Sequence, residues 1–138
     1  MNLKDLVAVS GMPGIYRMAA NRNNGLIIED LDTGKRKFAP ARKHQFTPLE
    51  SIAIFTMEQD SIELGKVFQN MLDQLDDNPP VSANGEAAVL QEYFADVLPD
   101  YDRERVNLSD IKKVIRWFGY LQERGYLTMP ADADSEEE

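Results

Sequence analysis

The sequence predicts an α+β protein in which a small SH3-like β-barrel, residues 1–58, is followed by a three-helix C-terminal unit, residues 59–128. Three observations support this class. Short apolar runs bounded by turn residues fill the first half of the chain, which is typical of short strands. Apolar residues recur at helical spacing from residue 60 onward. Between the two patterns lies one predicted helical turn followed by a strand, the element order of an SH3-like barrel.

The predicted strands of the barrel are short and end at turn residues. Three of them lie in GIYRMAA, GLIIEDL and KRKFAP, which begin at Gly14, Gly25 and Lys35. The sequence DTG at 32–34 predicts the hairpin turn between the last two. Pro13 and Gly14 predict a type II turn, because proline presets φ at the second position and glycine accepts a positive φ at the third. A phosphate-binding loop would need a helix after these glycines, and a strand-like run follows instead.

The last strand of the barrel is predicted within FTPLESIAIFT, residues 46–56. Thr47 has the N-cap position of a single helical turn, and Glu50 stands at capping-box spacing from it. Ile52 and Ile54 then alternate with small residues, as expected for a half-buried strand.

Three amphipathic helices are predicted after residue 60. The first runs through DSIELGKVFQNMLDQLDD from Asp60, and the second, EAAVLQEYFADVL, ends before Pro99. The third has Ser109 as its N-cap and Gly125 as its stop. The predicted buried faces are Leu64, Val67, Phe68, Met71, Leu72 and Leu75; Leu90, Tyr93, Phe94 and Val97; and Ile111, Val114, Ile115, Phe118 and Leu121.

Two segments outside these helices are predicted to lack regular structure. The segment near 76–86 contains two prolines, a glycine and polar residues, so it is the predicted flexible linker. The acidic tail at 129–138 is predicted to be disordered.

Composition and charge restrict the function classes. The net charge is −9, and it is uneven, because residues 1–50 carry +3 and residues 51–138 carry −12. The sequence contains no cysteine, which excludes a disulfide scaffold, a thiolate metal site and a cysteine nucleophile. The N-terminus does not resemble a signal peptide, and no apolar run approaches the roughly 18 residues of a membrane span. We therefore expect a cytoplasmic protein.

Four stretches in combination resemble a family of Bacteroidota proteins catalogued as a domain of unknown function. They are VSGMPGIYRM, GLIIEDLDTGKRKF, LESIAIFT and YFADVLPDYDRERVNLSDIKKVIRWFGYL. The resemblance covers almost the whole chain, residues 2–127, and implies a small β-domain followed by a helical domain. The family carries no assigned activity, so the resemblance implies no catalytic residues.

No catalytic or metal-binding set is predicted, and we expect neither enzyme activity nor a cofactor. His44 is the single histidine, whereas a histidine-based metal site usually takes two or more. Its polar surroundings in PARKHQF favour a surface or loop-packing role. No serine or threonine lies in a nucleophile-elbow setting. Asp30 and Asp32 resemble part of a calcium loop, but the closing ligands are missing and a hairpin turn explains them better.

The first candidate binding surface is a basic cluster in the barrel, made of Lys35, Arg36, Lys37, Arg42, Lys43 and His44. With the adjacent Phe38, such a cluster can bind single-stranded nucleic acid through phosphate pairing and base stacking. If Phe38 faces the core, strand alternation turns Lys35 and Lys37 outward. The alternative, which we favour, is a solvated strand edge whose lysines block edge-to-edge pairing.

The second candidate surface lies on the third predicted helix. Trp117 and Tyr120 stand about 90° or more from the centre of its apolar stripe. Such aromatic residues either pack against the other helices or form an exposed anchor for a partner. We favour packing for Trp117 and leave both alternatives open for Tyr120.

These observations lead us to expect a non-catalytic binding or adaptor protein whose partner is another protein. The alternative is an RNA- or DNA-binding accessory protein that uses the basic hairpin. The acidic net charge argues against strong nonspecific binding to nucleic acid, which depends on neutralising phosphates. A third class is an enzyme or ligand-binding protein with a site between the two halves.

Overall fold

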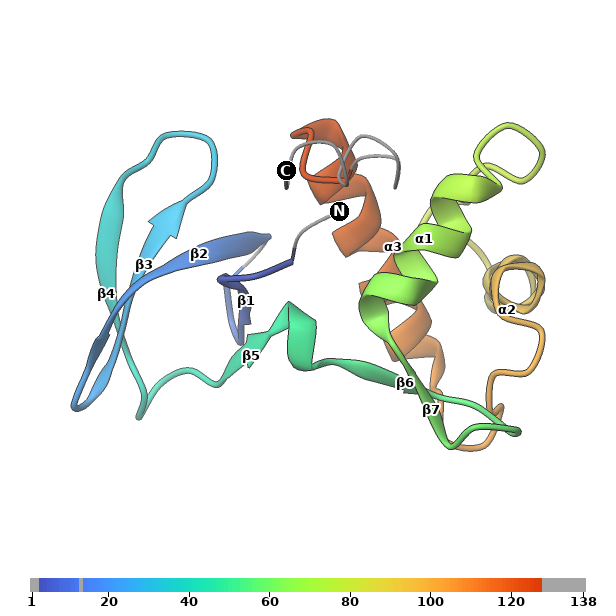
Figure 1. Cartoon of the computed structure of the whole chain (residues 1–138), viewed down its shortest axis with the longest axis horizontal. Coiled ribbons are helices and arrows are strands. Elements are labelled where there is room, and N and C mark those ends of the chain that lie inside the picture. The colour runs from blue at the N-terminus through green and yellow to red at the C-terminus, as the bar shows by residue number, and fades with distance from the viewer. Residues whose placement is uncertain (1–2, 13, 128–138) are drawn as a thin grey trace, which may run out of the picture. The chain divides into compact units, whose positions relative to one another are not determined.

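The computed structural model describes residues 3–12 and 14–127 (Figure 1). In these residues, seven strands, one 3-10 turn and three α-helices form an α+β protein, as predicted, and all strand pairs are antiparallel. The contact pattern divides the chain into two units, Leu3–Ile52 and the residues from Ala53 onward. The predicted acidic tail at 129–138 lies outside the described residues.

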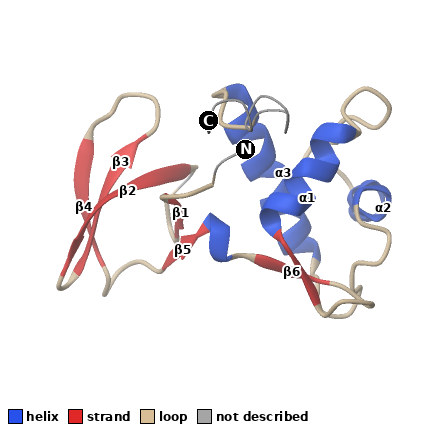
Figure 2. Ribbon diagram, viewed as in Figure 1, coloured by secondary structure: helices blue, strands red, loops and turns tan. Residues whose placement is uncertain are grey.

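The first unit contains a five-stranded antiparallel sheet, drawn in red in Figure 2. Its strands are β1 (Leu6–Val9), β2 (Ile15–Arg22), β3 (Gly25–Asp30), β4 (Arg36–Pro40) and β5 (Phe46–Pro48). The strand order is β4-β3-β2-β1-β5, and β4 and β5 do not pair with each other. The predicted closed barrel is therefore wrong, and the sheet is open. Because β5 spans only three residues before the chain turns away, it pairs with β1 alone.

The segment predicted to close the barrel belongs elsewhere. The predicted helical turn is confirmed as the 3-10 helix η1 (Leu49–Ser51), although Pro48 rather than Thr47 is its N-cap. The strand that follows, β6 (Ala53–Phe55), pairs with β7 (Ser61–Glu63) in a separate two-stranded sheet.

One face of the five-stranded sheet carries the core of the first unit. Buried residues from three strands form this cluster, and they are Val7, Val9, Leu26, Ile28 and Ala39. Met12, Tyr16, Met18 and Phe46 pack against it. At Gly14, φ is +79°, as the predicted turn requires, and Pro13 lies outside the described residues.

The strand β3 begins at a glycine for a steric reason. A Cβ atom at Gly25 would overlap the Ala39 carbonyl oxygen and lie 2.9 Å from Cζ of Phe38. The ring of Phe38 thus covers the position where a larger residue would place its side chain. A glycine at this strand position lets the neighbouring backbone approach closely.

The second unit contains the β6–β7 hairpin and three helices, α1 (Leu64–Asp73), α2 (Ala87–Val97) and α3 (Leu108–Glu123). The predicted buried faces are confirmed at every position except Leu75, which lies beyond α1 and is only half-buried. The rings of Phe68 and Phe118 meet at a centroid distance of 5.9 Å, which joins α1 to α3. The segment between Asp73 and Ala87 has no helix or strand, as predicted for a linker.

Two predicted helix starts are wrong. The first helix begins at Leu64 instead of Asp60, because residues 61–63 are extended and pair with β6. Asp60 has a φ of +63° and forms the turn of that hairpin. The third helix begins one residue after Asn107, whose side chain forms a capping box with Asp110. Ser109, the predicted cap, therefore lies inside the first turn.

Side chains of α1 bind the end of α2. The Asn70 amide donates to the Val97 carbonyl oxygen at 3.2 Å, and the Gln74 amide donates to the Asp96 carbonyl oxygen at 3.1 Å. The last carbonyl groups of a helix lack intrahelical partners, so these bonds satisfy two of them. They also fix α1 against α2.

The loop between α2 and α3 is tied to the β6–β7 hairpin through Asp102. Its N–H donates to the Phe55 carbonyl oxygen at 2.9 Å, and its carboxylate accepts bonds from Arg105 Nε and from the N–H groups of Glu104 and Arg105. The bond from the Arg105 side chain, with those from the backbone, holds the pKa of Asp102 below its usual range.

The close approach at Gly25 predicts the outcome of a glycine comparison. Gly25→Ala is expected to lower the free energy of unfolding by about 1–3 kcal/mol, because the added methyl group must displace backbone. Gly119→Ala, inside α3, is expected to raise it by about 0.5–1 kcal/mol, since a Cβ there meets no atom within 4 Å and alanine is the better helix former. Urea denaturation of both variants measures these changes. Equal destabilisation by both substitutions would contradict a specific steric requirement for glycine at position 25.

Tyr93 predicts a change of stability at alkaline pH. Its hydroxyl is buried and has no hydrogen-bond partner among the described residues, and burial raises the pKa of Tyr93 to about 12. The neutral Tyr93 side chain contributes fully to the free energy of unfolding below pH 10, because tyrosine in the unfolded chain has a pKa of about 10. This contribution is lost as the pH rises toward 12. Tyr93→Phe is expected to leave the unfolding free energy at pH 7 unchanged or higher by up to about 1 kcal/mol. It is also expected to reduce the alkaline loss seen in urea titrations.

A matched substitution serves as the control for Tyr93. Tyr126→Phe, which removes a hydroxyl from a half-buried tyrosine, is measured in parallel. Strong destabilisation by Tyr93→Phe at pH 7 would mean that the hydroxyl is bonded.

Candidate functional site

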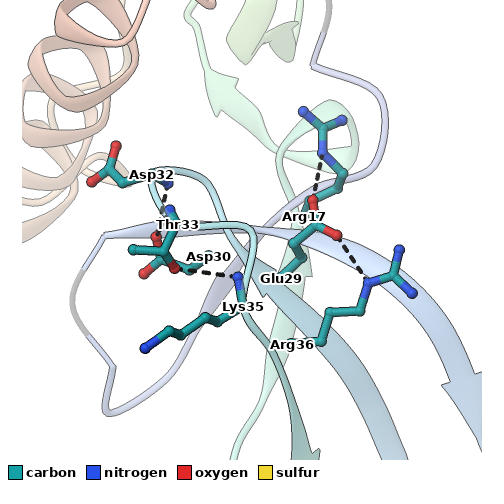
Figure 3. Close-up of polar contacts among 7 residues, drawn as sticks. All are labelled: Arg17, Glu29, Asp30, Asp32, Thr33, Lys35 and Arg36. Carbon is teal, nitrogen blue, oxygen red and sulfur yellow. Dashed lines mark hydrogen bonds and ion pairs between the residues drawn. The ribbon is translucent and has the colours of Figure 1, made fainter.

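The candidate site is a surface across β2, β3 and β4 in the first unit (Figure 3). We call it the hairpin face, and it consists of Arg17, Ile27, Glu29, Arg36 and Phe38. Glu29 on β3 lies opposite Arg17 on one side and Arg36 on the other, and Ile27 lies opposite Phe38. Directly opposed residues of antiparallel strands share a face, so these five side chains lie together, on the side away from the core cluster.

An ion-pair triad forms the polar half of the hairpin face. The Glu29 carboxylate lies 3.0 Å from Nε of Arg36 and 3.9 Å from Nε of Arg17 (Figure 3). The Arg36 side chain is 66% exposed, so water screens this pair. The triad therefore orients both guanidinium groups more than it stabilises the sheet.

Phe38 forms the apolar half, and its orientation corrects one expectation. The sequence suggested that Lys37 would face out if Phe38 faced the core. Instead Phe38 lies on the hairpin face and is 41% exposed. Lys37 lies opposite Ile28, on the side of the core cluster, and is exposed because β4 is an edge strand. A large aromatic side chain is thus presented to solvent beside the arginines.

The turn between β3 and β4 has the geometry predicted from DTG. Oδ1 of Asp30 accepts hydrogen bonds from the N–H groups of Asp32, at 2.8 Å, and Thr33, at 3.0 Å (Figure 3). The Lys35 N–H donates to Oγ1 of Thr33 at 3.2 Å, and Gly34 has a φ of +75°. Asp30 therefore orders the turn through its side chain. No group of three or more His, Asp or Glu side chains that could hold a metal ion occurs in residues 3–12 and 14–127.

The other predicted basic residues lie in the loop between β4 and β5. Arg42 and Lys43 are exposed there. His44 is half-buried, and its Nδ1 lies 2.7 Å from the Ser10 carbonyl oxygen, while the Gln45 N–H donates to Oγ of Ser10. The histidine thus joins this loop to the loop after β1.

The eight predicted site residues do not form one site, and of these only Arg36 belongs to the hairpin face. Lys35 and Lys37 border the hairpin face, whereas Arg42, Lys43 and His44 belong to the next loop. Trp117 and Tyr120 are half-buried on α3, in the other unit. The Arg124 guanidinium lies 3.6 Å from the centroid of the Tyr120 ring, so this aromatic side chain already has a cationic neighbour.

Three residues of the hairpin face, Arg17, Ile27 and Glu29, were not predicted from the sequence. Counting back from a tight turn at 23–24 would place Arg17 opposite Asp30. The register instead shifts between Met18 and Ala20, which brings Arg17 opposite Glu29. A β-bulge of this kind has no fixed sequence signal, so only the structure locates the triad.

Comparison with protein families identifies both units. Residues 52–121 match the model of a domain of unknown function (DUF6852). The chain belongs to this family. Residues 3–49 of this DUF6852 protein match the model of a second domain of unknown function (DUF5606). The two matches meet near the boundary at which the contact pattern separates the two units.

A solved structure resembles almost the entire DUF6852 chain. It is the solution NMR structure of a structural genomics target from Bacteroides vulgatus, with 33% sequence identity and a TM-score of 0.73. The likeness covers 93% of this chain and 91% of the other. The comparison with curated proteins gave no match. Among the described helices, none is both long and apolar enough to cross a membrane.

The exposed triad predicts a small, salt-sensitive coupling. In a double-mutant cycle of Glu29→Gln and Arg36→Gln, the expected coupling is below about 1 kcal/mol, because the Arg36 side chain is mostly in water. Urea denaturation at low and high ionic strength measures it, and the coupling is expected to fall with salt. A coupling above about 2 kcal/mol that persists in high salt would show that the triad is a structural requirement of the sheet.

Proposed function

We propose that this protein is a non-catalytic binding module that recognises another protein through the hairpin face. The observation that carries the proposal is Phe38, a residue that is 41% exposed in the centre of an edge strand. Ile27, opposite it, is half-buried, so the two side chains offer a small apolar patch beside Arg17 and Arg36. Aromatic and arginine side chains dominate the binding energy of protein interfaces.

The charge pattern favours a protein partner over nucleic acid. The hairpin face and its surroundings contain four cationic side chains and three carboxylates. The cations are Arg17, Lys35, Arg36 and Lys37, and the carboxylates are Glu29, Asp30 and Asp32. The local net charge is therefore only +1, and the whole chain carries −9. Binding to a phosphate backbone depends on a surplus of cations, whereas protein interfaces commonly combine both signs around an apolar centre.

Nucleic-acid binding is the second candidate, and one observation favours it. An exposed aromatic ring, Phe38, lies between basic residues on the same strand, as in surfaces that stack bases and pair with phosphates. Loss of binding in Lys35→Ala/Lys37→Ala, together with a strong dependence on salt, would distinguish this function from the first.

We further propose that the sheet is an opened form of an SH3-like barrel. The support is its strand order, in which the first strand lies between the second and the fifth, together with the single 3-10 turn next to β5. This fold hosts many functions, so it carries no argument about the partner.

Affinity capture with matched phenylalanine variants tests the proposed function. Phe38→Thr is expected to abolish capture of a protein from a native cell lysate, because it removes the exposed ring from the hairpin face. Phe55→Thr is the control, since Phe55 is also an exposed strand phenylalanine, at 44%, but lies on β6 in the other unit. Capture is expected to survive treatment of the lysate with nuclease.

Two outcomes would contradict the proposal. If Phe38→Thr captures the same proteins as the wild type, the hairpin face is not the binding surface. If captured material disappears after nuclease treatment, nucleic acid is the ligand and the second candidate replaces the first.

A further inference from the structure

On β4, the backbone N–H and C=O groups of every second residue point away from β3, toward the free edge of the sheet. The N–H of Asp30 donates to the Lys35 carbonyl oxygen at 2.9 Å, and the N–H of Ala41 donates to the Asn24 carbonyl oxygen at 2.8 Å. These two bonds lie at opposite ends of the β3–β4 ladder and show which of its opposed residue pairs are hydrogen-bonded. Only alternate residues of an antiparallel pair exchange hydrogen bonds. Lys37 and Ala39 therefore bond to β3, whereas the N–H and C=O groups of Arg36 and Phe38 point to the free edge.

This edge is open in the described sheet. β4 is the terminal strand of the order β4-β3-β2-β1-β5, and β3 is its one partner there. An exposed edge strand is a template for a further strand, and peptide recognition often uses this property. The residues with outward backbone groups, Arg36 and Phe38, are also the β4 residues of the hairpin face, so an added strand would contact backbone and side chains together.

Charge selects what can pair with the edge. Lys35, Arg36 and Lys37 are consecutive cations, and no carboxylate occurs from Lys35 to Thr47. A second copy of β4 would bring these cations against their counterparts, and like charges opposite each other destabilise a strand pair. An acidic strand instead meets Lys35 and Lys37, and Arg36 would then lie between its carboxylate and that of Glu29. The cations that prevent self-association thus favour an anionic partner.

Side-chain alternation specifies the pattern of the partner strand. In an antiparallel addition, the partner residue opposite Phe38 and the one opposite Arg36 lie on the hairpin face, while the residue between them lies beside Lys37. An apolar residue fits the exposed ring of Phe38. Acidic residues fit Lys37 and Arg36. The complementary pattern, read from the N-terminus to the C-terminus of the partner strand, is apolar–acidic–acidic.

We propose that the hairpin face binds an extended acidic segment of another protein, which adds as a strand to the free edge of β4. The inference rests on the proposed function and names the chemical class of its partner. Affinity comes from main-chain hydrogen bonds to Arg36 and Phe38, and specificity comes from the apolar–acidic–acidic pattern.

A pair of N-methylated peptides tests strand addition directly, with the full chain unaltered. The probe is a short fluorescent peptide, capped at both ends, with the central sequence Tyr-Glu-Asp, and binding is followed by fluorescence anisotropy. Methylation of the Asp nitrogen, opposite Arg36, removes a hydrogen bond to β4 and is expected to weaken binding by about tenfold. Methylation of the adjacent Glu nitrogen, opposite Lys37, places the methyl group away from β4 and is expected to change the affinity by less than about twofold.

A charge-reversed peptide completes the test. Replacement of both acidic residues of the probe by lysine is expected to weaken binding by at least about tenfold, because it opposes cations with cations. Absence of saturable binding of the acidic probe would overturn the proposal. Equal affinity for the two methylated peptides would also overturn it, because binding would then not involve the edge of the backbone.

The experiments distinguish failure of strand addition from failure of the proposed function. If Phe38→Thr abolishes capture but the methylated peptides bind equally, the hairpin face binds a protein by side chains alone and only strand addition is wrong. If Phe38→Thr leaves capture intact, the proposed function fails with it. Binding of the probe with the expected methylation pattern, with its loss in Phe38→Thr, supports both.

Discussion

One irregularity in β2 decides which side chains reach the hairpin face. The register between β2 and β3 shifts between Met18 and Ala20, so that Met18 lies opposite Ile28 and Arg17 opposite Glu29. Without the shift, Arg17 would lie opposite Asp30, on the side of the core cluster, and Met18 would leave that cluster. Because side chains alternate with a period of two, a shift of one residue exchanges the faces of every residue beyond it. The core and the surface triad thus depend on the same bulge.

A second constraint acts at the other end of the β3–β4 pair. Gly25 has no side chain, and the ring of Phe38 reaches the position that a side chain would occupy, while Phe38 remains 41% exposed. An aromatic side chain placed across a glycine compensates for the packing that the glycine lacks. Phe38 consequently has a structural contact and a free surface at once. This combination makes a rigid apolar group available for binding at a small cost in side-chain entropy.

The helical unit relies on a different principle. Its three apolar stripes meet in one core, which includes the contact between Phe68 and Phe118, and polar side chains complete the ends of its elements. Asn70 and Gln74 bind the last carbonyl groups of α2, and Asp102 ties the next loop to β6. Each of these polar groups satisfies a backbone partner that would otherwise lose a hydrogen bond on burial. The one buried hydroxyl of the described chain without such a partner, that of Tyr93, lies inside this core.

The elements whose signal is local and periodic could be predicted from the sequence. The helical stripes were predicted almost residue by residue, because a spacing of 3.6 is repeated several times in each helix, and the turn at 32–34 was predicted because its residue types suit one geometry. The pairing of the strands, the edges of the sheet and the orientations of Phe38, Arg17 and Lys37 could be read only from the folded chain. These features depend on one extra residue in β2 and on the end of β5 after three residues. Neither changes the repeating pattern of apolar residues from which strands are predicted.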